Sequence, residues 1–142
     1  MVLFSKDKIL VPIDFSEKSL DALKETIEFA DTLSNVHAVY VLKPLEATAP
    51  GVIWESVDTE NRAETIQKLF DNYFPKSKYE ALNFSIQQGD PAAEIVDFAE
   101  AEKMTLIVMP SRGRTGLSRF FMGSVAENVV RCAHCPVIVL RS

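Results

Sequence analysis

The sequence predicts an α/β protein built as a single doubly wound domain, with helices covering both faces of a parallel sheet. Short apolar runs alternate with segments of helical periodicity, and most of these runs are apolar on both faces. The length of 142 residues fits one domain, spanning residues 1–142. Strands that alternate with helices are joined by right-handed crossovers, which produce a parallel sheet. One fold must therefore carry the function.

Two strand–helix units occupy the first half of the chain. Residues 9–13 (ILVPI) form a continuous apolar run, which is typical of a strand buried on both faces. The next segment predicts a helix, because apolar side chains recur at helical spacing: Leu20, Leu23, Ile27 and Ala30. A second run, residues 36–42, is followed after a gap by another helical face: Ala63, Ile66, Phe70 and Tyr73. The second unit repeats the first.

The second half begins with a strand of a different kind. Residues 82–87 alternate apolar and polar side chains, which predicts an edge strand with one face in water. Asp90 and Pro91 predict a helix start, with Asp90 as N-cap and Pro91 at the first helical position. A strand, a helix and a last strand complete the chain, and we expect them at residues 105–109, 124–133 and 137–140.

A binding site is expected at the carboxyl ends of the strands, where the strand order reverses. Two segments are candidates to flank it: residues 12–14 at the end of the first strand, and the loop from Pro110 to Gly123 at the end of the fourth. A connection between a strand and a helix normally takes roughly 2 to 6 residues, so this loop is long. Excess length at such a place indicates a function.

The loop has the composition of an anion site. Its glycines let the backbone approach a ligand closely: Gly113, Gly116 and Gly123. Its basic side chains concentrate positive charge in a chain of net charge −5: Arg112, Arg114 and Arg119. The helix expected from Ser124 adds free N–H groups and the positive end of its dipole, and both favour phosphate.

Each of these signals has a structural alternative. Ser124 and Glu127 match a capping box, so Ser124 either caps its own helix or binds phosphate. Loop glycines more often serve turns, and exposed arginines are mostly solvated. Asp14 directly follows the first strand, where it either meets ribose hydroxyls, the interpretation that we favour, or starts the next helix as Ser16 does.

Two stretches of this sequence resemble the universal stress protein family. Residues 113–139 (GRTGLSRFFMGSVAENVVRCAHCPVIV) look like its carboxyl-terminal signature, and residues 8–16 (KILVPIDFS) look like its first strand. The ATP-binding branch carries a glycine, two residues, a second glycine, nine residues, and a closing glycine followed by serine or threonine. Gly113 and the pair 123–124 match this pattern, whereas Pro110 replaces the first glycine. Proline lacks an N–H, so a contact through that amide is lost while a carbonyl contact remains.

The resemblance implies a fold, a ligand and a partner. The fold has five parallel strands in the order 3-2-1-4-5. The ligand is ATP or a related adenine nucleotide, with Mg as its counter-ion close to Asp14 and no metal site formed by the protein alone. The last strand is then an open apolar edge, which predicts a homodimer through Val137, Ile138, Val139 and Leu140.

The resemblance also assigns parts of the nucleotide to residues. Pro12 and Asp14 would lie near the adenosine, Val41 would meet the adenine through its backbone, and Gly113 with the pair 123–124 would hold the phosphates. Together with their neighbours in the two flanking segments, the candidate nucleotide contacts are Pro12, Ile13, Asp14, Val41, Pro110, Arg112, Gly113, Arg114, Gly116, Gly123, Ser124 and Val125.

Composition argues against several other classes of function. An apolar fraction of 47% and a charged fraction of 25% are those of an ordinary globular protein. No apolar run approaches the roughly 20 residues of a membrane span, and the net charge of −5 disfavours nucleic acid or an anionic membrane as the main partner. The start is too short for a signal-peptide core and the chain has two cysteines, so we expect a cytoplasmic protein.

The rival functions are an enzyme and a nucleotide-independent module. The sequence has no P-loop ending in Gly-Lys-Ser/Thr, and its glycines follow the fourth strand, whereas the dinucleotide fingerprint follows the first. No nucleophile, base and orienting group are evident, so we expect no catalytic residue and slow hydrolysis at most. In the other rival, Pro110 closes the site and the chain acts as a dimeric signalling module.

Two features have no assigned role. Cys132 and Cys135 flank the end of the last expected helix, where the dipole disfavours thiolate, and with His134 they supply at most three zinc ligands. We therefore favour packing for both cysteines. The segment from Pro44 to Asp58 is long and apolar at its centre, around Val52, Ile53 and Trp54, and it either covers the adenine pocket, faces a partner, or covers the core.

Overall fold

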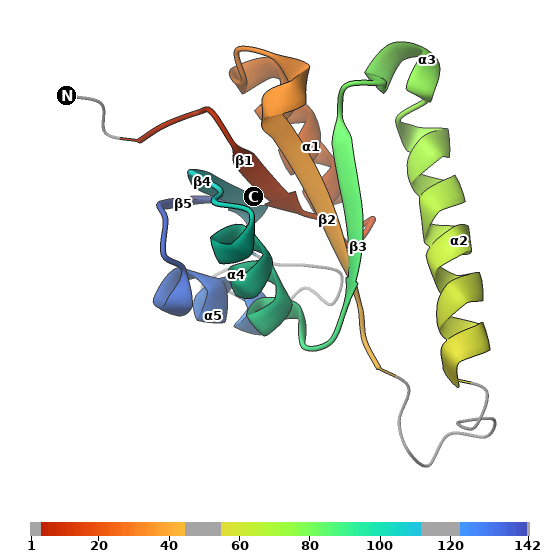
Figure 1. Cartoon of the computed structure of the whole chain (residues 1–142). Coiled ribbons are helices and arrows are strands. Elements are labelled where there is room, and N and C mark those ends of the chain that lie inside the picture. The colour runs from red at the N-terminus through yellow and green to blue at the C-terminus, as the bar shows by residue number, and fades with distance from the viewer. Residues whose placement is uncertain (1–3, 45–54, 112–122, 142) are drawn as a thin grey trace.

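A five-stranded parallel sheet forms the centre of the protein, in the order β3-β2-β1-β4-β5 (Figure 1). The computed structural model describes residues 4–44, 55–111 and 123–141. The strands are β1 (Ile9–Pro12), β2 (Val36–Leu42), β3 (Asn83–Gln88), β4 (Leu106–Pro110) and β5 (Val137–Leu140). The predicted fold class and strand order are both confirmed.

Helices cover both faces of the sheet. They are α1 (Glu17–Phe29), α2 (Glu55–Tyr73), α3 (Lys76–Tyr79), α4 (Pro91–Ala101) and α5 (Ser124–Cys132), with a 3-10 turn η1 (Leu33–Asn35). Side chains of α1 and α2 share one core cluster with the sheet, whereas side chains of α4 and α5 share the other. Figure 1 shows α4 and α5 side by side in front of the sheet, with α1 behind it. None of the helices in the described ranges is long and apolar enough to cross a membrane.

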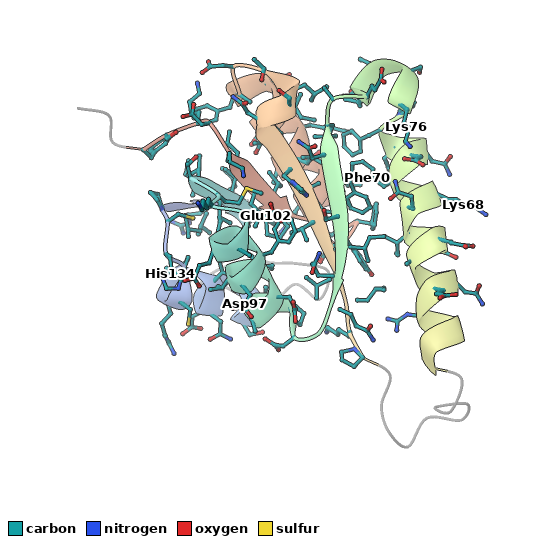
Figure 2. All side chains as sticks on the ribbon, in the orientation of Figure 1. Lys68, Phe70, Lys76, Asp97, Glu102 and His134 are labelled. Atoms are coloured by element: carbon teal, nitrogen blue, oxygen red, sulfur yellow. The ribbon has the colours of Figure 1, made fainter. Side chains whose placement is uncertain are left out.

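Aromatic stacking joins α2 to the edge strand β3. The ring of Phe70 lies parallel to that of Phe84, with 4.0 Å between centroids, and Phe74 stacks on Phe70 at 5.1 Å. Figure 2 shows Phe70 on the side of α2 that faces the sheet and Lys68 on the outer side. Burying an aromatic ring of this size contributes about 1.5–3 kcal/mol, so this stack stabilises the packing of α2 on β3.

Local signals in the sequence explain where the helices begin. The Ser16 side chain accepts a hydrogen bond from the Ser19 amide and caps α1. Asp90 accepts one from the Ala93 amide at 3.1 Å, and Pro91 is the first residue of α4, as predicted. Gly89 has a φ of +144°, a backbone conformation that residues other than glycine rarely adopt.

The boundaries differ from prediction at several places. Ile13 lies beyond β1, and β4 runs one residue further than expected, through Pro110. Helix α2 begins at Glu55, so the connection expected to run to Asp58 is shorter. The short helix α3 was not predicted; its last residue, Tyr79, packs edge-on against Phe74 at 5.2 Å, and this tertiary contact has no signature in the sequence.

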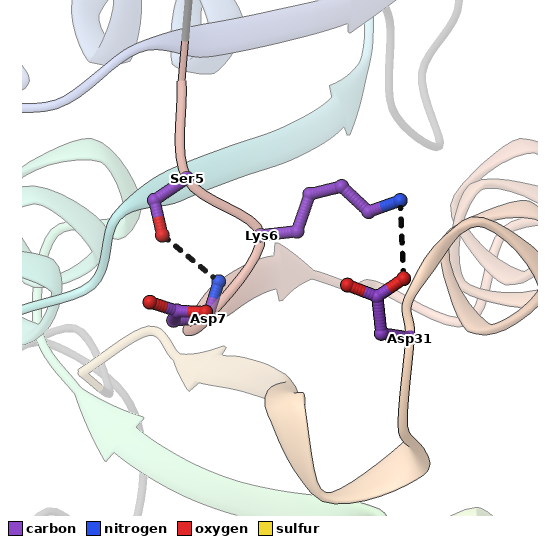
Figure 3. Close-up of polar contacts among 4 residues, drawn as sticks. All are labelled: Ser5, Lys6, Asp7 and Asp31. Atoms are coloured by element: carbon purple, nitrogen blue, oxygen red, sulfur yellow. Dashed lines mark hydrogen bonds and ion pairs between the residues drawn. The ribbon is translucent and has the colours of Figure 1, made fainter. Parts of the chain in front are cut away.

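The segment before β1 is attached to the end of α1. The Lys6 ammonium lies 3.6 Å from an Asp31 carboxylate oxygen, and the Asp7 amide donates to the Ser5 hydroxyl at 3.1 Å (Figure 3). The same ammonium lies 4.2 Å from the centre of the Phe29 ring. An exposed ion pair contributes at most about 1 kcal/mol, so these contacts orient the segment more than they stabilise the fold.

We expect His37 to make the stability of the fold depend on pH. Its Nε2 lies 2.8 Å from the Ser85 hydroxyl, and its ring packs edge-on against Phe98. Burial lowers the pKa of His37 below 6.5; the Glu102 carboxylate opposes this shift and Lys8 adds to it. The unfolded chain therefore binds more protons below pH 6.5, and the melting temperature should fall as the pH drops through this range.

The variant His37→Gln should reduce the dependence of the melting temperature on pH, because glutamine does not titrate. Thermal melts between pH 7 and 5 measure this dependence. An equal slope in the variant and in the natural protein would contradict the prediction.

Candidate nucleotide site

The ladder between β1 and β4 ends before either strand does. The two strands pair only at Ile9 with Leu106 and at Leu10 with Ile107, although β1 continues to Pro12 and β4 to Pro110. On their other sides the same strands stay paired to their ends, because Pro12 is in register with Val39 of β2 and Pro110 with Leu140 of β5. The break therefore lies where the strand order reverses, which is the expected place for a ligand.

Two prolines explain the break. In β1 the Ile13 amide donates to Val39 of β2, so the alternate residue, Pro12, faces β4. In β4 the amides of Ile107 and Ser111 donate toward β5, so Pro110 faces β1. The next two rungs between β1 and β4 would need the N–H groups of these prolines, and proline has none. The sequence itself thus keeps the carboxyl ends of β1 and β4 unpaired.

Backbone hydrogen bonds bring the start of α5 to the end of β4. The Ser111 amide donates to the Leu140 carbonyl at 2.9 Å, and the Gly123 amide donates to the Ser111 carbonyl at 2.7 Å. The long loop is therefore closed at its base, beside the break between β1 and β4. The loop residues predicted to contact phosphate lie outside the described residues: Arg112, Gly113, Arg114 and Gly116.

Helix α5 begins without a side-chain cap. Its N-cap is Gly123, with φ −66° and ψ 158°, and the Gly123 carbonyl accepts from the Glu127 amide at 3.0 Å. Ser124 is the first helical residue and is exposed, so of the two alternatives for Ser124 the structure contradicts the one in which it caps this helix. A glycine N-cap has no side chain to accept from the first-turn amides. The amino end of α5, with Val125 half-buried in its first turn, keeps the chemistry of an anion site.

Asp14 forms a turn between β1 and α1. A carboxylate oxygen accepts from the Ser16 amide at 3.0 Å, and the Asp14 amide donates to the Ser19 hydroxyl at 3.2 Å. The Ser19 hydroxyl in turn donates to the Ser16 carbonyl at 3.0 Å. Asp14 thus helps to start α1. In the sequence this role was the alternative to contact with ribose hydroxyls, which we favoured. The Asp14 side chain is half-buried at the carboxyl end of β1.

Val41 lies on the neighbouring strand at the same edge. It is the second-last residue of β2, is half-buried, and packs against the cluster shared with α4 and α5. Since Pro12 is in register with Val39, Val41 stands two residues further toward the carboxyl edge, next to the Asp14 turn. The structure therefore brings residues 12–14, Val41, Pro110 and residues 123–125 to one edge of the sheet, at the ends of β2, β1 and β4.

Two residues near this edge were missed by sequence reasoning. Phe15 has a φ of +61°, an outlier for a bulky side chain, and no sequence pattern signals it. Arg62 on α2 donates through Nη2 to the Lys43 carbonyl at 3.0 Å, just beyond β2, and its buried Nη1 has no hydrogen-bond partner among the residues that the structure describes. A basic side chain on a helix is ordinarily solvated, so its position in the sequence carried no signal.

The cysteines lie away from this edge. Cys132 is exposed at the last position of α5, and burial raises the pKa of the Cys135 thiol, which disfavours the reactive thiolate. His134 lies 3.3 Å from the Glu100 carboxylate of α4. Within the described ranges, no three His, Cys, Asp or Glu side chains are grouped closely enough to hold a metal ion.

The whole chain, including this edge, is similar to known proteins. The family model of the universal stress proteins matches residues 6–141. The chain belongs to the universal stress protein family. Universal stress protein MJ0531 of Methanocaldococcus jannaschii is 37% identical over 143 residues, which cover 94% of this chain and 81% of that relative. Universal stress protein YxiE of Bacillus subtilis is 28% identical, over 95% of this chain and 99% of its own.

Solved universal stress proteins share the fold. The structure of MJ0577, also from Methanocaldococcus jannaschii, has a TM-score of 0.81 at 31% identity and covers 96% of both chains. A universal stress protein solved in complex with cAMP has a TM-score of 0.65 at 17% identity and covers 95% of this chain and 96% of its own. The resemblance noted in residues 8–16 and 113–139 is thus confirmed at the level of the family.

Proposed function

We propose that this universal stress protein binds ATP or a related adenine nucleotide and acts as a stress-response sensor or regulator. The observation that carries the proposal is the placement of the α5 amino end beside the unpaired ends of β1 and β4, through the bonds linking Leu140, Ser111 and Gly123. Free helix amides at a strand-order switch point are suited to phosphate. The cAMP complex of another family member supports an adenine nucleotide as the ligand class.

In this proposal the nucleotide lies along the carboxyl edge of the sheet. The adenosine contacts residues 12–14 and the backbone of Val41, and the phosphates contact Gly123, Ser124 and Val125. The loop residues Arg112, Gly113, Arg114 and Gly116 add positive charge and close backbone approach. Mg accompanies the phosphates near Asp14, because carboxylate oxygens are ligands that a hard cation prefers.

The proposal assigns binding and signalling, with no efficient catalysis. The sequence suggests no nucleophile, base and orienting group, and the hydrogen bonds that join Asp14 and Ser19 to Ser16 have a structural role at the start of α1. Residues 1–142 act as one domain, and the cytoplasm is the compartment that we propose for it.

We further propose that the protein forms a homodimer through β5. All four residues of β5 are apolar and half-buried, and β5 is the last strand of the sheet. The carbonyls of Pro136 and Leu140 accept from β4, so the backbone groups of the alternate residues, Val137 and Val139, face the open edge. An open apolar edge of this kind favours pairing with a second chain.

A calorimetric titration with ATP and magnesium tests the nucleotide assignment. Mass analysis first establishes that no nucleotide copurifies with the protein. Saturable binding with one nucleotide per chain is the expected result. The second candidate function, a dimeric module independent of nucleotide, is favoured by Pro110 at the first glycine position of the motif. An intact dimer without measurable ATP binding would select it.

Pro110 should limit the nucleotide affinity of this chain. Pro110→Gly and Pro110→Ala both restore an N–H that faces β1, for which the Pro12 carbonyl and a nucleotide at this edge would compete as acceptors. A hydrogen bond to a phosphate oxygen is charge-assisted, so we expect either variant to bind ATP about tenfold more tightly in calorimetry. A gain in the glycine variant alone would assign the effect to backbone freedom, and no gain in either would contradict the prediction.

A further inference from the structure

The residue that follows Asp14 adopts a strained backbone conformation. Phe15 has a φ of +61°, in the left-handed region that favours glycine. A bulky residue stays there only when its surroundings hold it, and such residues gather at functional sites. The position of Phe15, directly after β1 and before the cap of α1, places this strain beside the proposed nucleotide site.

Two tyrosines from distant segments hold the Phe15 ring. Its centroid lies 5.5 Å from that of Tyr40 in β2, with a tilted geometry, and 6.0 Å from that of Tyr73, with a stacked one. Tyr73 is the last residue of α2 and is 47% exposed, so it contributes little to the core other than this contact. Phe15 itself packs against the cluster that α1 and α2 share with the sheet.

The conformation of Phe15 sets the turn on either side of it. One residue earlier, the Asp14 carboxylate accepts from the Ser16 amide, and the Asp14 amide donates to Ser19. One residue later, the Ser16 side chain caps α1. These two hydrogen bonds of Asp14 span Phe15, so a change in the φ of Phe15 would move the Asp14 carboxylate relative to β1.

We propose that Phe15 is a positioning residue for the nucleotide site. Its ring, anchored on Tyr40 and Tyr73, locks the left-handed turn that orients Asp14 toward the ligand. The anchor links the end of α2 to the binding edge without touching the nucleotide. This inference rests on the proposed function for its ligand, but the turn itself can be measured without any ligand.

The first test removes the two rings of the anchor one at a time and leaves Asp14 and Ser16 unchanged. Tyr73→Ala deletes the exposed outer ring, and Phe15→Gly deletes the inner ring while relieving the backbone strain. We expect both variants to lose about tenfold in ATP affinity by calorimetry, with the melting temperature lowered less by Phe15→Gly than by Phe15→Ala. Tyr73→Phe keeps the ring and should retain the affinity of the natural protein.

A matched control separates positioning from general loss of packing. Phe29 is another exposed aromatic, at 40%, and lies at the far end of α1, where it contacts Phe4 and Lys6. Phe29→Ala should lower the melting temperature and leave the ATP affinity unchanged. Equal affinities in Tyr73→Ala, Phe15→Gly and Phe29→Ala would overturn the proposal.

Amide hydrogen exchange gives a readout that needs no nucleotide. The Ser16 amide, bonded to Asp14, should exchange at least about tenfold faster in Tyr73→Ala and Phe15→Gly than in Phe29→Ala. Unchanged Ser16 exchange would overturn the positioning role whatever the affinities are. If the natural protein binds no nucleotide, the proposed function fails, and the exchange rates still decide whether Phe15 holds the turn.

Discussion

Gly123→Val is expected to abolish nucleotide binding while leaving the domain folded. The valine side chain would occupy the approach of the phosphates to the amino end of α5, where Gly123 is the N-cap. We expect the ATP affinity to fall at least about 100-fold, which corresponds to about 2.7 kcal/mol, in calorimetric titration. The fold should tolerate the change, because a φ of −66° with a ψ of 158° is ordinary extended backbone for any residue.

Ala133→Val is the matched control for this variant. Ala133 is the C-cap of the same helix, with φ −64° and ψ 146°, so the added side chain starts from almost the same backbone conformation. It lies at the end of α5 where the dipole is negative and no phosphate is expected. Melting temperature and ATP affinity are measured for both variants. Unchanged ATP affinity in Gly123→Val, or equal losses in Gly123→Val and Ala133→Val, would contradict phosphate binding at the start of α5.

Val139→Pro is expected to convert the proposed dimer to a monomer. The amide of Val139 faces the open edge of β5, so proline there removes a donor from the interface and none from the ladder with β4. Sedimentation or light scattering should report the mass of a single chain at concentrations where the natural protein is dimeric. The melting temperature of the monomer should fall only by the amount that association with the partner contributed.

The neighbouring residue gives the contrasting variant. Ile138 faces β4 with its backbone groups, so Ile138→Pro removes a ladder hydrogen bond inside the chain. We expect this variant to be destabilised by about 1–3 kcal/mol, because a carbonyl of β4 loses its donor. A dimer that survives Val139→Pro would show that β5 does not pair with a second chain through its backbone.

Hydrophobic patterning predicted the fold because it reflects burial directly. The continuous run of residues 9–13 and the alternation of residues 82–87 correspond to the central strand β1 and the edge strand β3. Asp90 and Pro91 marked the start of α4 because capping is a local interaction. The family signature in residues 113–139 then indicated the strand order, which the alternation of helices and strands alone leaves open.

The parts that sequence reasoning missed depend on contacts between distant segments. Ser124 and Glu127 fit a capping box, yet the Gly123 amide is held by Ser111, and this bond starts α5 one residue earlier than a Ser124 cap would. The strain at Phe15 arises from rings on β2 and α2, far away in the chain. Pro12 and Pro110 were each visible, but their joint effect appears only when β1 and β4 are neighbours.

An NMR titration with ATP and magnesium tests the central claim most directly, because it locates the ligand as well as detecting it. We expect saturable shifts of the amides of Asp14, Val41, Gly123, Ser124 and Val125, with little change along β3 and the outer face of α2. Shifts confined to β3 or α2, or no saturable shift at all, would contradict a nucleotide site at the carboxyl ends of β1 and β4.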